Sequence, residues 1–148
     1  MLDLNKIFLK KRLASINLVV LDVDGVLTDG NIYLDSNGIE TKRFNVKDGL
    51  GIKLMQENNI EIALISGGTS ESSLSRAKRL NIKYCFFEVT NKLRKLKDLK
   101  KSLKLKESEI LYMGDDLNDL PVKDFVGLFI APRDANNFVK KKADIVKR

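Results

Sequence analysis

The feature that most constrains the fold is a series of short, nearly continuous apolar runs separated by helical patterns. The first run covers residues 16–23 and is rich in β-branched residues, which is typical of a strand buried on both faces of a parallel sheet. Similar runs cover residues 60–65, 83–87, 110–113, 126–130 and, more weakly, 143–146, and helical patterns cover residues 48–58, 69–80, 91–103 and 117–124. This alternation predicts right-handed βαβ units, and therefore an α/β fold with a doubly wound parallel sheet.

One segment breaks the alternation. Residues 31–35 and 39–44 have strand-like patterns and flank Ser36-Asn37-Gly38, which is a turn signal. We therefore expect a β-hairpin inserted over about residues 30–45. The chain has no internal repeat, low-complexity stretch or linker composition, so residues 1–148 are predicted to form one domain with a hairpin appendage.

Composition limits the kinds of function. The 148 residues are 43% hydrophobic and 32% charged, enough for a real core and a hydrated surface. The chain shows neither an apolar run of about 20 residues nor the apolar stretch of a secretory signal, so we expect a cytoplasmic protein without a membrane partner. Histidine is absent, which excludes His-based triads and His-ligated metals, and leaves carboxylates as the main acids, bases and metal ligands.

The net charge of +7 raises the question of nucleic acid. Residues 92–106 carry eight Lys or Arg against a single Asp98, but Leu93, Leu96, Leu99 and Leu103 recur at helical spacing there. The basic residues then occupy the opposite, solvated face of a helix. Since no aromatic residues are interleaved with the lysines to stack on bases, we expect no nucleic-acid partner.

Polar side chains follow four of the predicted strands. In open parallel sheets, ligands bind beyond the carboxyl ends of the strands, where these side chains are expected to meet. The residues concerned are Asp22 and Asp24, then Ser66 with Gly67, then Lys92, then Asp115 with Asp116.

This set of residue types suits phosphoryl transfer. Acids ending a buried strand are costly unless they are paired or bind a cation, and several oxygen ligands without His or Cys favour Mg²⁺. An aspartate such as Asp22 can act as a nucleophile, and a second acid, Asp24, can protonate the leaving alcohol and later deprotonate water. Ser66 and Lys92 would hold the phosphoryl oxygens, because such catalysis is mainly positioning and electrostatic stabilisation.

The same residues resemble the four motifs of the haloacid dehalogenase superfamily, in the same order. The motifs are Asp22-Val-Asp24-Gly-Val-Leu-Thr28, Ser66 at the end of Leu-Ile-Ser, Lys92, and Gly114-Asp115-Asp116-Leu-Asn-Asp119. More narrowly, residues 15–146 resemble the 3-deoxy-D-manno-octulosonate 8-phosphate phosphatases, through Asp24-Gly-Val-Leu-Thr-Asp-Gly30, Gly38-Ile-Glu40, Phe44-Asn-Val-Lys-Asp48-Gly49 and Asp115-Asp-Leu-Asn-Asp-Leu-Pro121.

The resemblance implies a Mg²⁺-dependent phosphatase of lipopolysaccharide biosynthesis that acts on a small sugar-acid phosphate. It implies a homotetramer without a large cap domain, with the hairpins at its centre. Asp22 would be nucleophile and metal ligand, Asp24 acid/base and a ligand through its main-chain carbonyl, and Asp115 the third ligand. Asp24, Thr28, Ser66, Gly67 and Lys92 would contact the substrate.

Some roles stay open at this point. Asp116 and Asp119 read as supporting acids, and Asp119 equally as a residue that caps or orients the following helix. Thr28 and Asp29 are as consistent with turn formation as with substrate contact. Asp48 reads better as the N-cap of its helix than as a residue of the entrance.

Two features depart from the family. Relatives commonly carry Thr-Gly-Arg after the second catalytic strand, whereas this chain has Ser66-Gly67-Gly68; they also often continue into a Gly-rich tail, whereas this sequence stops at Arg148. A nonulosonate 9-phosphate therefore remains an alternative substrate. A non-catalytic oligomerisation module and a nucleic-acid end phosphatase are weaker alternatives.

Overall fold

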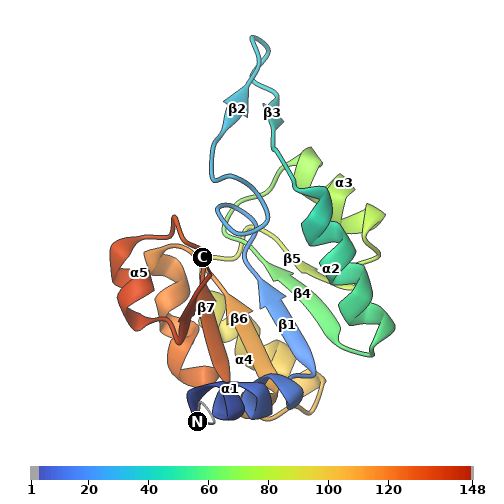
Figure 1. The fold of residues 1–148 in the computed structure, drawn as a ribbon. Coiled ribbons are helices and arrows are strands. Elements are labelled where there is room, and N and C mark those ends of the chain that lie inside the picture. Colours follow the sequence, from blue (N-terminus) through green and yellow to red (C-terminus); the bar gives the residue numbers. More distant parts are fainter. Residues whose placement is uncertain (1–3, 148) are drawn as a thin grey trace.

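The computed structural model describes residues 4–147, with side chains from residue 7 onward. A six-stranded sheet in the order β5-β4-β1-β6-β7-β8 forms its centre, and all neighbouring strands are parallel (Figure 1). The strands are β1 (Leu18–Leu21), β4 (Glu61–Ile65), β5 (Tyr84–Phe86), β6 (Ile110–Met113), β7 (Leu128–Ala131) and β8 (Ile145–Val146). The chain winds outward from β1 to β5 and then returns to β6, which confirms the predicted doubly wound sheet.

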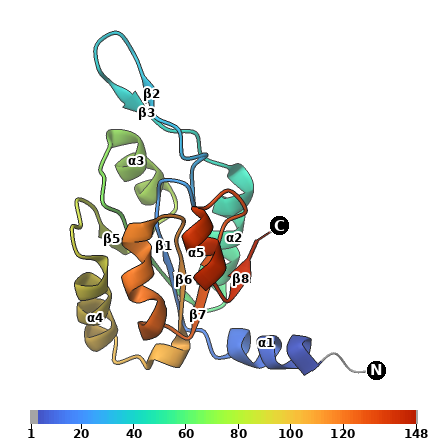
Figure 2. The same cartoon turned by 90° about the vertical axis from the view of Figure 1, so that its left-hand side faces the viewer.

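Helices cover both faces of the sheet (Figure 2). They are α1 (Leu4–Ala14), α2 (Val46–Glu57), α3 (Glu71–Arg79), α4 (Lys92–Ser102) and α5 (Asn137–Lys142), with the 3₁₀ helices η1 (Glu107–Glu109) and η2 (Leu117–Phe125). Side chains of β1 alternate between two buried clusters: Leu18 and Val20 pack with residues of α4, η2 and α5, whereas Val19 and Leu21 pack with residues of α2 and α3. This period of two explains why the strand sequence is apolar throughout.

The helices differ from the sequence-based expectations in three ways. The helices α1 and α5 were not predicted. The pattern over residues 117–124 is a 3₁₀ helix; it contains Pro121, which has no N–H to give to an α-helical ladder. Asp48 is not the N-cap of α2, because Asn45 has the extended backbone of that position and accepts a hydrogen bond from the Lys47 N–H at 2.9 Å. Asp48 lies in the first helical turn instead.

The predicted hairpin is present. Strands β2 (Tyr33–Leu34) and β3 (Glu40–Thr41) pair antiparallel and project beyond the carboxyl ends of the sheet strands (Figure 1). The Asp35 carboxylate accepts hydrogen bonds from two N–H groups of the turn, and an isolated bridge between Thr28 and Phe44 closes the base of the hairpin. This base holds the hairpin next to the strand ends.

Helix α4 has the predicted division of faces except at its first residue, Lys92, which is buried. Leu96 and Leu99 are buried in the core, and Lys95 and Lys97 lie over the rings of Phe86 and Phe125. Within the part of the chain described, no helix is both long enough and apolar enough to cross a membrane.

Candidate active site

The predicted site residues meet where the winding of the sheet reverses, at the carboxyl ends of β1 and β6. A cavity of about 450 Å³ opens there, lined by Asp22, Asp24, Gly25, Gly30, Ser66, Gly67, Gly68, Asp115, Asp116 and Asn118. Such a reversal point is where open α/β sheets bind their ligands. A neighbouring cavity of about 430 Å³ is lined by residues of the 27–29 and 43–48 segments, including Thr28 and Asp48.

Asp22 is held by two donors at the end of β1. Its Oδ1 accepts the Val23 N–H at 2.7 Å, and its Oδ2 accepts the Lys92 ammonium at 2.6 Å. Burial, followed by the nearby Asp119 carboxylate, raises the pKa of Asp22 to about 7 in the metal-free protein, although Lys92 opposes this rise. The Asp22 carboxylate is thus buried, fixed in orientation and surrounded by more negative than positive charge. These properties suit a nucleophile that also binds a cation.

Lys92 lies behind Asp22 rather than on the cavity wall. It is the first residue of α4, and its buried ammonium also contacts Asp119 Oδ1 at 2.8 Å. Burial alone would lower the pKa of Lys92, but Asp22 and Asp119 outweigh it, so that the pKa lies above its usual value. The lysine is therefore charged, and it ties the strand-end acid to the acid of η2.

Asp119 is fully buried and saturated with donors. Besides Lys92, its Oδ1 accepts the Tyr112 hydroxyl at 2.7 Å, and its Oδ2 accepts the N–H groups of Asp115 and Asp116 at 3.1 and 3.3 Å. Both roles left open by the sequence are thus present: the side chain supports Lys92 and also closes a capping box with Asp116 at the start of η2. Tyr112, which the sequence reasoning did not single out, completes this inner cluster.

Carboxylate oxygens of Asp22, Asp115 and Asp119 lie within 4.8 Å of one another. Because Asp119 is already saturated, Asp22 and Asp115 are the side chains of this group that remain suitable as ligands of a hard cation. Burial, then the charges of Asp119 and Asp116, raises the pKa of Asp115 to about 6 without metal. Gly25 has φ +78°, and a Cβ there would come within 2.0 Å of Asp115 Oδ2, so a glycine lets this carboxylate approach.

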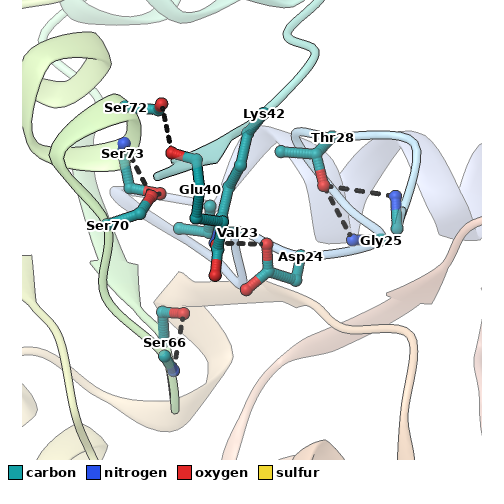
Figure 3. A network of polar contacts seen from close by, with 12 residues as sticks. Val23, Asp24, Gly25, Thr28, Glu40, Lys42, Ser66, Ser70, Ser72 and Ser73 are labelled. Carbon is teal, nitrogen blue, oxygen red and sulfur yellow. Dashed lines mark hydrogen bonds and ion pairs between the residues drawn. The ribbon is translucent and has the colours of Figure 1, made fainter. Parts of the chain in front are cut away.

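The Asp24 side chain is not part of this group of acids. It is 46% exposed, and its Oδ1 pairs with the Lys42 ammonium at 2.7 Å (Figure 3). This pairing leaves the main-chain carbonyl as the group of Asp24 for a metal. Sequence reasoning missed Lys42, because a contact between side chains 18 positions apart leaves no local pattern.

The remaining predicted residues lie on loops around the cavity. Ser66 is buried at the end of β4, and its Oγ accepts the Gly68 N–H at 3.3 Å, while Gly67 lines the cavity. The Thr28 hydroxyl accepts the N–H groups of Gly25 and Gly30, both at 3.2 Å. Thr28 thus shapes the loop after β1, which is the turn-forming role considered above.

Comparison with known proteins agrees with this geometry. The family of haloacid dehalogenase-like hydrolases matches residues 87–148. The 3-deoxy-D-manno-octulosonate 8-phosphate phosphatase of Escherichia coli K12 is 42% identical over 134 residues, covering 90% of this chain and 71% of that protein.

Solved structures of similar proteins have the same fold. The Moraxella catarrhalis 3-deoxy-D-manno-octulosonate 8-phosphate phosphatase, in complex with magnesium, phosphate and KDO, superposes with a TM-score of 0.91 at 35% identity, covering 97% of this chain and 81% of that one. The Yersinia pestis enzyme gives a TM-score of 0.91 at 38% identity, covering 93% and 75%. The chain therefore belongs to the 3-deoxy-D-manno-octulosonate 8-phosphate phosphatase family of haloacid dehalogenase-like hydrolases.

Proposed function

We propose that this protein hydrolyses 3-deoxy-D-manno-octulosonate 8-phosphate in a Mg²⁺-dependent reaction through an aspartyl-phosphate on Asp22. The observation that carries the proposal is that Asp22, Lys92 and Asp115 lie together at one end of the sheet, next to a cavity. The identity to phosphatases of this substrate supports the choice of sugar acid. A scaffold without activity has no need for several acids at partly or fully buried positions.

The donor set fits Mg²⁺. Asp22 and Asp115 offer carboxylate oxygens, and the Asp24 main-chain carbonyl would complete the protein ligands, with no nitrogen or sulfur donor in this acidic group. When bound, Mg²⁺ offsets the negative charge of the acids and of the phosphoryl oxygens.

In the first chemical step, an Asp22 oxygen attacks phosphorus. A new P–O bond to Asp22 forms and the ester P–O bond breaks, while the carboxylic acid of Asp24 gives its proton to the departing sugar oxygen. Lys92 keeps Asp22 oriented through the 2.6 Å contact, and the buried Ser66 hydroxyl faces the phosphoryl oxygens together with Gly67.

In the second step, water attacks the phosphorus of the aspartyl-phosphate. Asp24, now a carboxylate, takes the proton from water, the bond to Asp22 breaks, and inorganic phosphate leaves. Both residues return to their starting protonation states. Asp24 is suited to serving both steps because its side chain is partly exposed at the cavity, unlike that of Asp22.

The substrate is tested by phosphate release from 3-deoxy-D-manno-octulosonate 8-phosphate, a nonulosonate 9-phosphate and p-nitrophenyl phosphate, each with Mg²⁺ or EDTA. We expect metal-dependent turnover with preference for the first. The nonulosonate is included because Gly68 replaces the arginine of relatives. Preference for it would change the proposed substrate, and absence of turnover on all three would favour the non-catalytic alternative.

We also propose a homotetramer assembled through the hairpins, in the cytoplasm. Exposed apolar side chains on the hairpin support the assembly: Ile32, Tyr33, Leu34 and Ile39. Such a cluster of apolar side chains typically marks a protein interface. Analytical ultracentrifugation of the wild type and of Leu34→Glu tests it; a monomeric wild type would contradict the proposal.

A further inference from the structure

Lys42 is an unusual lysine for an extended segment at the base of a hairpin. Its side chain is only 3% exposed, and its ammonium lies between two carboxylates, Asp24 Oδ1 at 2.7 Å and Glu40 Oε1 at 3.3 Å (Figure 3). Burying an ammonium is unfavourable unless it is paired in this way. Lys42 therefore has a defined position, set by its two partners.

The hairpin base fixes where this ammonium lies. Lys42 directly follows β3, and two residues later Phe44 forms the bridge to Thr28 on the loop after β1. On the other side, the Ser72 hydroxyl near the start of α3 donates to the Glu40 carbonyl at 3.4 Å. Lys42 is thus held between the loop that carries Asp24 and the helix that follows Ser66.

The contact orients one oxygen of Asp24 and leaves the other toward the cavity. Oδ1 is bound by Lys42, whereas Oδ2 lies 3.5 Å from where a Cβ on Gly68 would be, on the cavity wall. A half-exposed aspartate without such a contact would sample several rotamers. With the Lys42 contact in place, Oδ2 always faces the cavity.

We propose that Lys42 is a positioning residue for the acid/base Asp24, acting by fixing Oδ1 so that Oδ2 faces the ester oxygen of the substrate. This inference rests on the proposed phosphatase function and on the role given there to Asp24. It assigns the hairpin a part in the chemical step, because the ammonium comes from the hairpin while the carboxylate comes from the sheet.

A direct role of Lys42 in binding the carboxylate of a sugar acid is less consistent with its surroundings. The ammonium is nearly inaccessible, and two carboxyl groups of the protein already occupy its contacts. Aryl phosphates distinguish the two roles, because they have no carboxylate and their leaving groups differ in how much they need an acid.

The test is kcat/KM of wild type and Lys42→Met on p-nitrophenyl phosphate and phenyl phosphate with Mg²⁺. Nitrophenolate leaves without much help, whereas phenolate needs a proton. Since kcat/KM covers only the steps up to the first P–O cleavage, hydrolysis of the aspartyl-phosphate does not affect it. We expect a loss of roughly 10- to 100-fold on phenyl phosphate and less than about 3-fold on p-nitrophenyl phosphate, since general acid catalysis is worth about 100-fold or more.

Controls separate positioning from folding. Lys101→Met removes an exposed lysine from α4, at the far end of the molecule from the hairpin, and should change neither rate. Thermal unfolding checks whether Lys42→Met folds. If it does not, Glu40→Gln, which removes the negative charge of the second partner of the ammonium, should show the same substrate-dependent loss to a smaller degree. Lys42→Arg, which keeps the charge, should recover part of the phenyl phosphate activity.

Equal losses on both aryl phosphates, or no loss, in a folded variant would overturn the inference while leaving the proposed function in place. So would a loss confined to substrates with a carboxylate. If the wild type hydrolyses neither aryl phosphate nor any sugar-acid phosphate with Mg²⁺, the proposed function itself fails, and this inference fails with it.

Discussion

Two groups of charged side chains lie at the same end of the sheet and are held in different ways. The inner cluster consists of Asp22, Lys92, Tyr112 and Asp119, all buried and connected by contacts of 2.6–2.8 Å. The rim group consists of Asp24, Lys42 and Glu40, in which the side chain of Lys42 is buried but those of the two acids are partly exposed.

The difference follows from where the residues come from. Asp22 directly follows β1 and Tyr112 lies within β6, both in the centre of the sheet. Lys92 begins α4, and Asp119 lies on η2, which packs against α4. The rim group joins the loop after β1 to a two-stranded hairpin that projects from the sheet. Under the proposed mechanism, the covalent step therefore belongs to the part of the fold built on the central sheet, and the proton transfer to the part that joins the sheet to the hairpin.

The largest effect is expected for the nucleophile of the inner cluster. Asp22→Asn replaces the attacking carboxylate by an amide, so turnover on every phosphate monoester should fall by about 10⁴-fold or more. Steady-state phosphate release measures it, with circular dichroism as the check of folding. Appreciable residual activity in the folded variant would rule out the covalent route.

Asp119→Ala should weaken the whole inner cluster. It leaves the ammonium of Lys92 and the hydroxyl of Tyr112 without their shared partner. Breaking a buried ion pair in this way typically costs about 3–5 kcal/mol of unfolding free energy. Urea unfolding in EDTA measures the loss.

The matched control is Asp98→Ala, at an exposed position of α4, which should change the free energy of unfolding by less than about 0.5 kcal/mol. Similar values for the two variants would mean that the inner cluster contributes little to the fold, and the contrast with the rim group would lose its physical basis.

A smaller effect concerns pH and metal. The pKa values of about 7 for Asp22 and about 6 for Asp115 exceed the usual 3.8, so between about pH 4 and 7 the folded metal-free protein binds more protons than the unfolded chain. Its free energy of unfolding should therefore fall as the pH rises through that window. Because Mg²⁺ binds the deprotonated acids, the stabilisation that it provides should grow over the same window.

Thermal unfolding with EDTA and with Mg²⁺, at about pH 5 and about pH 8, measures both trends. Asp115→Asn should remove most of the Mg²⁺-dependent rise in Tm and stabilise the metal-free protein at the higher pH. A Mg²⁺ effect that is equal at both values, or that survives in this variant, would contradict the assignment of Asp115 as a ligand.

The contrast also separates what the sequence predicts from what it does not. The sheet, the hairpin and the acids at the strand ends were predictable, because buried parallel strands leave continuous apolar runs and their polar ends follow directly in sequence. Asp24 was expected beside Asp22, but its side chain is drawn toward Lys42, 18 positions away. The inner contact of Asp119 with Tyr112 and the cap at Asn45 instead of Asp48 depend on local geometry that residue types alone do not specify.

The smallest effect is expected from a change at the rim that restores the arginine of relatives. A Cβ at Gly68 would lie 3.5 Å from Asp24 Oδ2, an ordinary contact, so Gly68→Arg should fold. If the guanidinium reaches the carboxylate of the substrate, kcat/KM for the sugar-acid phosphate should rise by about 3- to 10-fold, as one exposed charge contact is worth about 1 kcal/mol. The kcat/KM for p-nitrophenyl phosphate should stay within about 2-fold, because this substrate lacks the carboxylate.

Gly68→Ala is the control for the backbone. A fall on the sugar-acid phosphate but not on p-nitrophenyl phosphate, seen with Arg but not with Ala, would mean that the new cation competes with Lys42 for Asp24, so the rim would be as sensitive to its charge pairing as the inner cluster.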